Sequence, residues 1–137
     1  NIFLCLTKQF GRGIGVKKVM IDSKVFSNLQ GTELSNFSEK PTTLTSGQQE
    51  ASKELWASAD GRIRAGVWEC TEGQFTADRT KIAEYCHIIS GSAMVENEND
   101  ETRRTITAGD LLILPVGWKG TWTIITHIRK LYILSES

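Results

Sequence analysis

The residues of this chain that most readily do chemistry lie close together in the segment 82–90. Glu84 and Cys86 are two positions apart, so they share one face of an extended strand, and His87 lies on the other face. A carboxylate in an enclosed apolar pocket can act as a general acid or base, and a cysteine in an electropositive site can become a nucleophile. Because a nearby carboxylate opposes thiolate formation, Cys86 also fits a small apolar core residue.

The cysteines and histidines form neither a disulfide framework nor a thiolate zinc pattern. Cys5, Cys70 and Cys86 are an odd number without a CxxC pair, so we expect reduced thiols and a cytoplasmic protein. His87 and His127 are far apart in the sequence. Each of them fits a structural position as well as a catalytic one.

Short β-prone runs separated by turn signals must position these side chains. Asp60-Gly61 supplies the positive φ angles of a tight hairpin between the expected strands 54–59 and 62–70. Gly91 is expected to end the strand that carries Glu84. Further strands are expected at 74–76, 82–90, 93–96, 104–107, 111–114, 121–125 and 130–134.

This alternation of strands and turns predicts an all-β fold. Helix is expected at most as a turn or two within 48–55, because no longer stretch keeps a helical period. Antiparallel strands in this number avoid open edges by forming a jelly roll or a closed barrel. At 137 residues the chain is expected to hold one such domain, spanning residues 20–137.

The overall charge bears on the kind of partner. Sixteen basic and sixteen acidic residues leave no net charge, which argues against nucleic acid or an anionic membrane as the partner. A small neutral or mixed-charge molecule fits better. Residues 1–19 are expected to be a flexible basic arm without a targeting signal. The glycines of that arm also allow a phosphate-loop interpretation, but the strand and helix that such a loop requires do not flank it.

Two motifs carry a resemblance to a known family. The stretch 109–117 reads GDLLILPVG and resembles the second cupin motif, a glycine, five residues, then Pro-x-Gly. Glu84, followed by Gly91, resembles the end of the first cupin motif. Residues 65–134 are similar to the small single-domain, RmlC-like cupins grouped with ureidoglycine aminohydrolase. The resemblance implies a double-stranded β-helix, or jelly-roll barrel, with Glu84 and Cys86 facing its interior.

The metal ligands of this family are largely missing. A metal-binding cupin would carry His-x-His shortly before the glutamate, where this chain has Ala77-Asp78-Arg79-Thr80, and a further histidine where it has Gly120. Imidazole nitrogens are the main ligands of a divalent cation in such a site. We therefore expect no metal or other cofactor, although Asp78 with Glu84 could still hold a hard cation loosely.

Tryptophans and one lysine are the remaining candidates for a binding site. Trp122 shares a strand face with Trp118 and Gly120, and the missing histidine at position 120 is expected to open room beside Trp122. Strand parity places Trp68 with the outward arginines and leaves Ile63, Ala65 and Val67 on the buried side, unless a bulge at Gly66 turns Trp68 inward. Lys119 is either a ligand contact at the barrel mouth or a solvated lysine on the rim.

Three functions remain open. The chain could be an enzyme acting on a small polar carbon–nitrogen or sugar-like metabolite, with Glu84 as the catalytic group and Trp68, Cys86, Trp122 and Lys119 binding the substrate. It could instead bind a small molecule without chemistry, or serve as a dimeric interaction subunit. A homodimer paired through sheet edges is expected in any case. Glu84 is expected to line an open cavity beside Trp122 with at most one protein donor.

Overall fold

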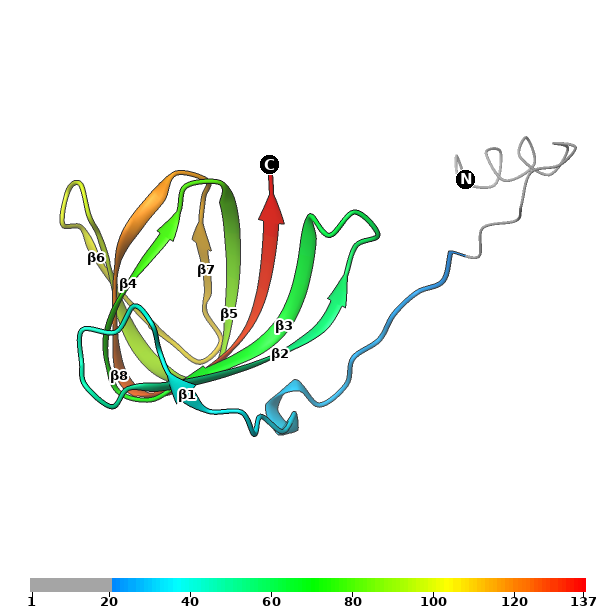
Figure 1. Ribbon diagram of the computed structural model, residues 1–137, viewed down its shortest axis with the longest axis horizontal. Coiled ribbons are helices and arrows are strands. Elements are labelled where there is room, and N and C mark those ends of the chain that lie inside the picture. Colours follow the sequence, from blue (N-terminus) through cyan, green and yellow to red (C-terminus); the bar gives the residue numbers. More distant parts are fainter. Residues whose placement is uncertain (1–20) are drawn as a thin grey trace, which may run out of the picture.

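The computed structural model describes residues 21–137 as a sheet of eight strands with one short 3-10 helix (Figure 1). The predicted all-β jelly-roll fold is confirmed, and the predicted arm at 1–19 lies outside the described residues. The elements are η1 (Leu29–Gly31), β1 (Ser38–Glu39), β2 (Gln49–Ala57), β3 (Ile63–Cys70), β4 (Gly73–Arg79), β5 (Ile82–Asn97), β6 (Arg103–Thr107), β7 (Leu111–Leu114) and β8 (Trp118–Glu136).

Two long strands, β5 and β8, hold the barrel together. They are antiparallel neighbours along nearly their whole length, from Ile82 opposite Glu136 to Asn97 opposite Gly120. One half of the barrel adds β3 and β2 beside the end of β8, and β7 beside the start of β5. The other half adds β4 beside the start of β8 and β6 beside the end of β5.

Gly91 bends β5 and does not end it, contrary to the sequence prediction. Its φ is +84°, and the pairing with β8 shifts register between Ile88 and Ala93. The backbone of His127 crosses so close to Gly91 that a Cβ there would overlap His127 O and lie 2.7 Å from Ile128 Cα. The strand therefore passes from one half of the barrel into the other at this glycine.

The possible helical turn at 48–55 is a strand. Residues 49–57 form β2, which pairs with β3 and has one register shift, between Glu54 and Trp56. The segment is too polar for the sequence alone to favour a strand, and its pairing with the apolar β3 decides its conformation.

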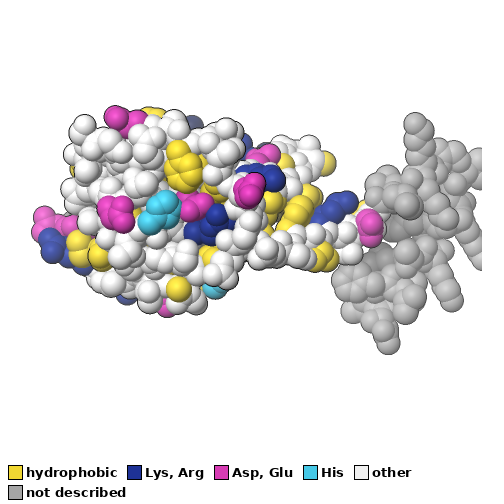
Figure 2. Space-filling view, turned by 90° about the horizontal axis from the view of Figure 1, so that it is seen from below, with side chains coloured by type: hydrophobic (Ala, Val, Ile, Leu, Met, Phe, Trp, Pro, Cys, Tyr) yellow, Lys and Arg dark blue, Asp and Glu magenta, His cyan; other side chains and the backbone are white. Residues whose placement is uncertain are grey.

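The surface of the domain carries both signs of charge. Figure 2 shows acidic and basic side chains interspersed with hydrophobic ones on one face of the molecule, without a continuous basic area on that face. In the part of the chain that the structure describes, no helix is long and apolar enough to cross a membrane.

Candidate functional site

Strand alternation on β5 places a carboxylate inside the barrel. Glu84, Cys86 and Ile88 face the interior and are buried, while Tyr85 and His87 on the opposite face are exposed. This orientation is the one that the family resemblance implies. Glu84 is opposite Leu114 of β7 on one side and Leu134 of β8 on the other.

Both oxygens of Glu84 are bound by cationic side chains. Arg79, at the end of β4, donates from Nε and Nη2 to Oε1 at 3.0 and 2.7 Å. Lys130, from the middle of β8, lies with Nζ 2.8 Å from Oε2. The prediction that Glu84 would have at most one protein donor is therefore wrong. Arg79 and Lys130 were not identified from the sequence as site residues.

These contacts keep the carboxylate ionised. Burial on its own would raise the pKa of Glu84, but the charges and hydrogen bonds of Lys130 and Arg79 outweigh it and lower the pKa to about 2. Burial would likewise lower the pKa of Lys130, yet Glu84 raises it above the ordinary value of 10.5. Glu84 and Lys130 are therefore both charged throughout the neutral range.

Three aromatic rings form one wall of the barrel interior. Phe75 stacks on Trp122 at 5.9 Å between ring centres, and Trp68 meets both rings edge-on. The Nζ of Lys130 lies 4.3 Å from the centre of the Trp68 ring and 4.4 Å from that of Trp122. The ammonium is thus held between a carboxylate and two indole faces, which favour a cation.

A second ion pair lies at the same wall. Lys40 Nζ is 2.9 Å from Glu50 Oε1, and the same oxygen accepts a hydrogen bond from Trp68 Nε1 at 2.8 Å. The Lys40 ammonium also lies 4.4 Å from the centre of the Phe75 ring. Lys40 and Glu50 therefore fix the orientation of two of the aromatic rings.

The two ion pairs and the aromatic wall border one cavity of about 250 Å³. Glu84 and Trp122 both line it, in agreement with the expected placement. The cavity is lined by Lys40, Glu50, Ser52, Trp68, Phe75, Arg79, Glu84, Trp122, Lys130, Tyr132 and Leu134.

Trp68 faces the cavity by plain strand alternation. It lies opposite Lys130 of β8 and Ser52 of β2, and β3 runs along β8 without a register shift, so no bulge at Gly66 is needed. The bulge lies in the neighbouring strand, between Glu54 and Trp56. Ile63, Ala65 and Val67 were expected on the buried side of β3, and they lie on the face opposite the cavity. Val67 is fully buried there, whereas Ile63 is exposed, contrary to the expectation.

Gly120 does not open room beside Trp122. A Cβ at this position would overlap the carbonyl oxygen of Glu96 and the ring of Trp118. The indole of Trp118 is held in that place by a 2.8 Å hydrogen bond from its Nε1 to Asn97 Oδ1. The space expected to be open is therefore filled by the backbone of β5 and by Trp118.

Lys119 and Asp78 lie outside the barrel. They face each other across β4 and β8, with Lys119 Nζ 3.9 Å from Asp78 Oδ2, and both are exposed. They border a separate polar hollow of about 360 Å³, whose lining residues include neither Glu84 nor an aromatic side chain. Lys119 is therefore not at the mouth of the cavity, and Asp78 is not placed to share a cation with Glu84.

The thiol of Cys86 is buried in the core. Burial is the main cause that raises its pKa to about 12, with the neighbouring Glu84 acting in the same direction. Cys70 is also buried, and its pKa is raised to about 11. Cys86 does not line the cavity, so it is not placed to contact a ligand there. Both thiols fit the apolar core interpretation.

The interior does not fit the metal that the cupin resemblance implies. Within residues 21–137, no three His, Cys, Asp or Glu side chains lie close enough together to hold a metal ion. His87 is exposed on the outer face, and His127 pairs there with Glu69 at 2.7 Å. The carboxylates that border the cavity, Glu50 and Glu84, are already paired with lysine and arginine.

Comparison with known families extends these observations. A family model described as the EutQ-like cupin domain matches residues 57–132, a little over half of the chain. No curated protein sequence matches the chain.

Several solved structures share the fold. The Clostridium difficile EutQ protein superposes with a TM-score of 0.58 at 20% identity, over 66% of this chain and 70% of that one. A DUF861-family protein of unknown function from Pseudomonas syringae pv. tomato gives 0.63 at 24% identity, over 75% of this chain and 43% of that one. Ectoine synthase from P. lautus gives a TM-score of 0.59 at 18% identity, over 72% of this chain and 67% of that one. At these identities the likeness shows the fold alone.

Proposed function

This chain belongs to the EutQ-like cupin family, and we propose that its barrel binds a small carboxylate-bearing metabolite without chemically changing it. The observation that carries this proposal is the position of Glu84 between Arg79 and Lys130. A general base works best with a pKa near the working pH, and a carboxylate with a pKa of about 2 is a poor proton acceptor at neutral pH.

The same reasoning sets the catalytic hypothesis aside. Lys130 has a raised pKa, so it does not provide a neutral amine for nucleophilic attack. The buried thiol of Cys86 has a pKa of about 12 and does not line the cavity. Hydrolysis of a carbon–nitrogen bond, as the resemblance to ureidoglycine aminohydrolase implies, would need a group that accepts a proton here. The carboxylates of the cavity are instead paired with lysine and arginine side chains.

The charge balance of the cavity favours an anion. Three cationic side chains, Lys40, Arg79 and Lys130, border it together with two carboxylates, Glu50 and Glu84. One positive charge is therefore left for a ligand to neutralise. Each ammonium has three N–H donors, so each keeps donors beyond its single carboxylate contact.

The size of the cavity and its aromatic wall limit the ligand further. A volume of about 250 Å³ is below the range typical of sites for drug-sized molecules, so the ligand is a small metabolite. Trp68, Phe75, Trp122 and Tyr132 give the cavity flat apolar surfaces. A compact carboxylate with a planar or apolar body satisfies both the charge and the shape of this site.

Two measurements test the proposal. Native mass spectrometry of protein purified without denaturant identifies any small molecule retained in the barrel. Tryptophan fluorescence, titrated with pyruvate, succinate and benzoate and with the neutral analogue benzamide, compares charged with uncharged ligands. We expect a carboxylate to bind, benzamide to bind at least tenfold more weakly than benzoate, and the ligand to be recovered unchanged.

Two variants localise the binding. Arg79→Met removes a cation of the cavity and is expected to weaken carboxylate binding at least tenfold. Lys119→Met removes a lysine from the outer hollow and is expected to leave binding unchanged. Equal binding of benzoate and benzamide, or recovery of a chemically altered ligand, would contradict the proposal.

A further inference from the structure

Two hydroxyl groups that border the cavity have no partner in the described part of the protein. Tyr132 and Ser52 both line the cavity, and within residues 21–137 neither hydroxyl makes a hydrogen bond with another residue. The lysines, the arginine and the two carboxylates of the cavity are all paired with one another. No fully buried polar side-chain atom of the described residues lacks a partner, so the two hydroxyls are open to the cavity or to solvent.

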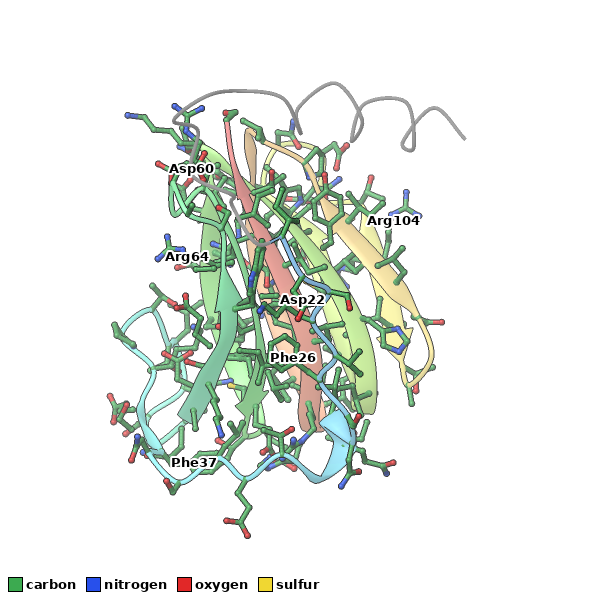
Figure 3. All side chains as sticks on the ribbon, turned by 90° about the vertical axis from the view of Figure 1, so that its right-hand side faces the viewer. Asp22, Phe26, Phe37, Asp60, Arg64 and Arg104 are labelled. Atoms are coloured by element: carbon green, nitrogen blue, oxygen red, sulfur yellow. The ribbon has the colours of Figure 1, made fainter. Side chains whose placement is uncertain are left out.

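A glycine in β3 gives the Tyr132 ring its place. Gly66 lies opposite Tyr132 of β8 on one side and opposite Glu54 of β2 on the other. Figure 3 shows the last part of β8, drawn in red, between β3 and β5. A Cβ at Gly66 would overlap Tyr132 Oη and lie 2.5 Å from Lys53 O. The phenol therefore lies across β3, and its hydroxyl is directed towards β2.

The hydroxyls are separated from the cations at Glu84 by the indole of Trp68. Ser52, Trp68 and Lys130 lie opposite one another on β2, β3 and β8. Two strand spacings therefore separate the backbones of Ser52 and Lys130, which is about 10 Å. The Nζ of Lys130 lies 4.3 Å from the centre of the Trp68 ring. A ligand held by Lys130 reaches the hydroxyls only along the face of this indole.

The hydroxyl side of the cavity suits an uncharged polar group. Burial, followed by the charge of Glu54, raises the pKa of Tyr132 above its ordinary value of 10.0, so the phenol stays protonated and donates a hydrogen bond at neutral pH. The same carboxylate disfavours a second anionic group beside Tyr132. A serine hydroxyl both donates and accepts, so Ser52 can accept the proton of a ligand hydroxyl that accepts from Tyr132.

We infer that the metabolite bound in this barrel is a hydroxycarboxylate whose hydroxyl is at the opposite end of the molecule from its carboxylate. This inference rests on the proposed function, because it places the carboxylate at Arg79 and Lys130. The body of the ligand lies along Trp68, and its hydroxyl binds Tyr132 and Ser52. A hydroxyl on a carbon close to the carboxylate stays on the cationic side of Trp68 and does not reach them.

Four matched ligands separate the two ends of the site. Isothermal titration calorimetry with benzoate, 4-hydroxybenzoate, benzamide and 4-hydroxybenzamide measures the effects of the carboxylate and of the hydroxyl independently. One added hydrogen bond changes affinity by about two- to tenfold. We expect the 4-hydroxyl group to tighten binding about fivefold in both the acid and the amide. Terephthalate, with a second carboxylate in place of the hydroxyl, is expected to bind more weakly than 4-hydroxybenzoate.

The two tyrosines of the chain provide a matched pair of variants. Tyr132→Phe is expected to reduce the preference for 4-hydroxybenzoate over benzoate to about one. Tyr85→Phe, on the opposite face of the sheet, is expected to keep it. Because the Tyr132 hydroxyl has no partner among the described residues, circular dichroism melting curves of both variants should match the wild type.

The outcomes distinguish this inference from the proposed function. Equal binding of benzoate and benzamide would contradict the proposed function. Equal binding of benzoate and 4-hydroxybenzoate by the wild type would overturn the inference alone, as would the same preference in Tyr132→Phe and Tyr85→Phe. Tighter binding of terephthalate than of 4-hydroxybenzoate would also overturn it, in favour of a dicarboxylate.

Discussion

Inside the barrel, Nζ of Lys130 lies 2.8 Å from Oε2 of Glu84, and this contact joins the two longest strands through their side chains. Both residues are buried, so neither charge is screened well by water. Arg79 approaches the other oxygen of Glu84 from β4. One carboxylate thus connects three strands at the wall of the cavity.

Removing the ammonium should destabilise the fold strongly. Lys130→Met leaves Glu84 buried with one cationic partner, and breaking a buried pair from one side costs about 3–5 kcal/mol. We expect a loss of this size in the free energy of unfolding, measured by urea denaturation with tryptophan fluorescence. The double variant Glu84→Gln with Lys130→Met should recover most of the loss, because it leaves no buried carboxylate without its ammonium.

Lys119→Met is the control for that experiment. Its partner, Asp78, is exposed and the two charges are 3.9 Å apart, so the free energy of unfolding should change by about 0.5 kcal/mol or less. A similar loss for Lys119→Met and Lys130→Met would show that the buried Glu84–Lys130 pair contributes no more to stability than the exposed Lys119–Asp78 pair.

Acid should weaken the wild type more than a variant that lacks the carboxylate. The pKa of Glu84 falls from its ordinary value of 4.5 to about 2 on folding, so its contribution is present above pH 4.5 and is lost as the pH falls towards 2. A shift of this size corresponds to about 3 kcal/mol. Urea denaturation at pH 6 and pH 3 should therefore show a larger loss for the wild type than for Glu84→Gln. Equal losses in the two proteins would contradict the ionised state of Glu84.

Adding one methyl group at Gly120 should destabilise the barrel. In Gly120→Ala the new Cβ overlaps Glu96 O and the Trp118 ring, and overpacking of this kind costs about 1–3 kcal/mol. Trp118→Ala in the same chain should not relieve the strain, because the clash with the backbone oxygen remains. Urea denaturation of the two variants and of Trp118→Ala alone measures these effects. Full recovery in the double variant would show that only the indole limits position 120.

The two interior thiols should be unreactive in the folded protein. Cys70 and Cys86 are buried and their pKa values are raised to about 11 and about 12, so little thiolate is present at pH 7. In a Cys5→Ser background, a colorimetric thiol reagent should label no cysteine rapidly in buffer and both cysteines in urea. Rapid labelling of Cys86 in buffer would revive its interpretation as a nucleophile.

Strand alternation and turn chemistry predicted the parts of the structure that depend on local sequence. The face on which Glu84, Cys86 and Ile88 lie follows from a period of two, and the GDLLILPVG stretch predicted β7 and its flanking turns. Trp68 was harder to place, because β3 is apolar on both faces and parity alone does not tell the inner face from the outer one.

The chemistry of the cavity depends on pairings that local sequence does not encode. Lys130 lies between Ile128 and Tyr132 on one face of β8, and a lysine on an otherwise apolar strand face is the signal that could have identified it. Arg79 was noted only as a residue standing where metal ligands are missing. That it binds Glu84 follows from the position of β4 beside β8, which the sequence does not reveal.

Because both halves of the barrel contain β5 and β8, these two strands also determine how the sheet can form during folding. On one side β3 pairs with the last part of β8, so Val67 is paired with Leu131 across the segment that holds β4 to β7. Long-range pairing of this kind slows folding, because two segments far apart in the chain must be brought together, at a cost in chain entropy, before their contacts form. Because β8 is the partner of both β3 and β5, one edge of each of these strands stays unpaired until β8 is in place.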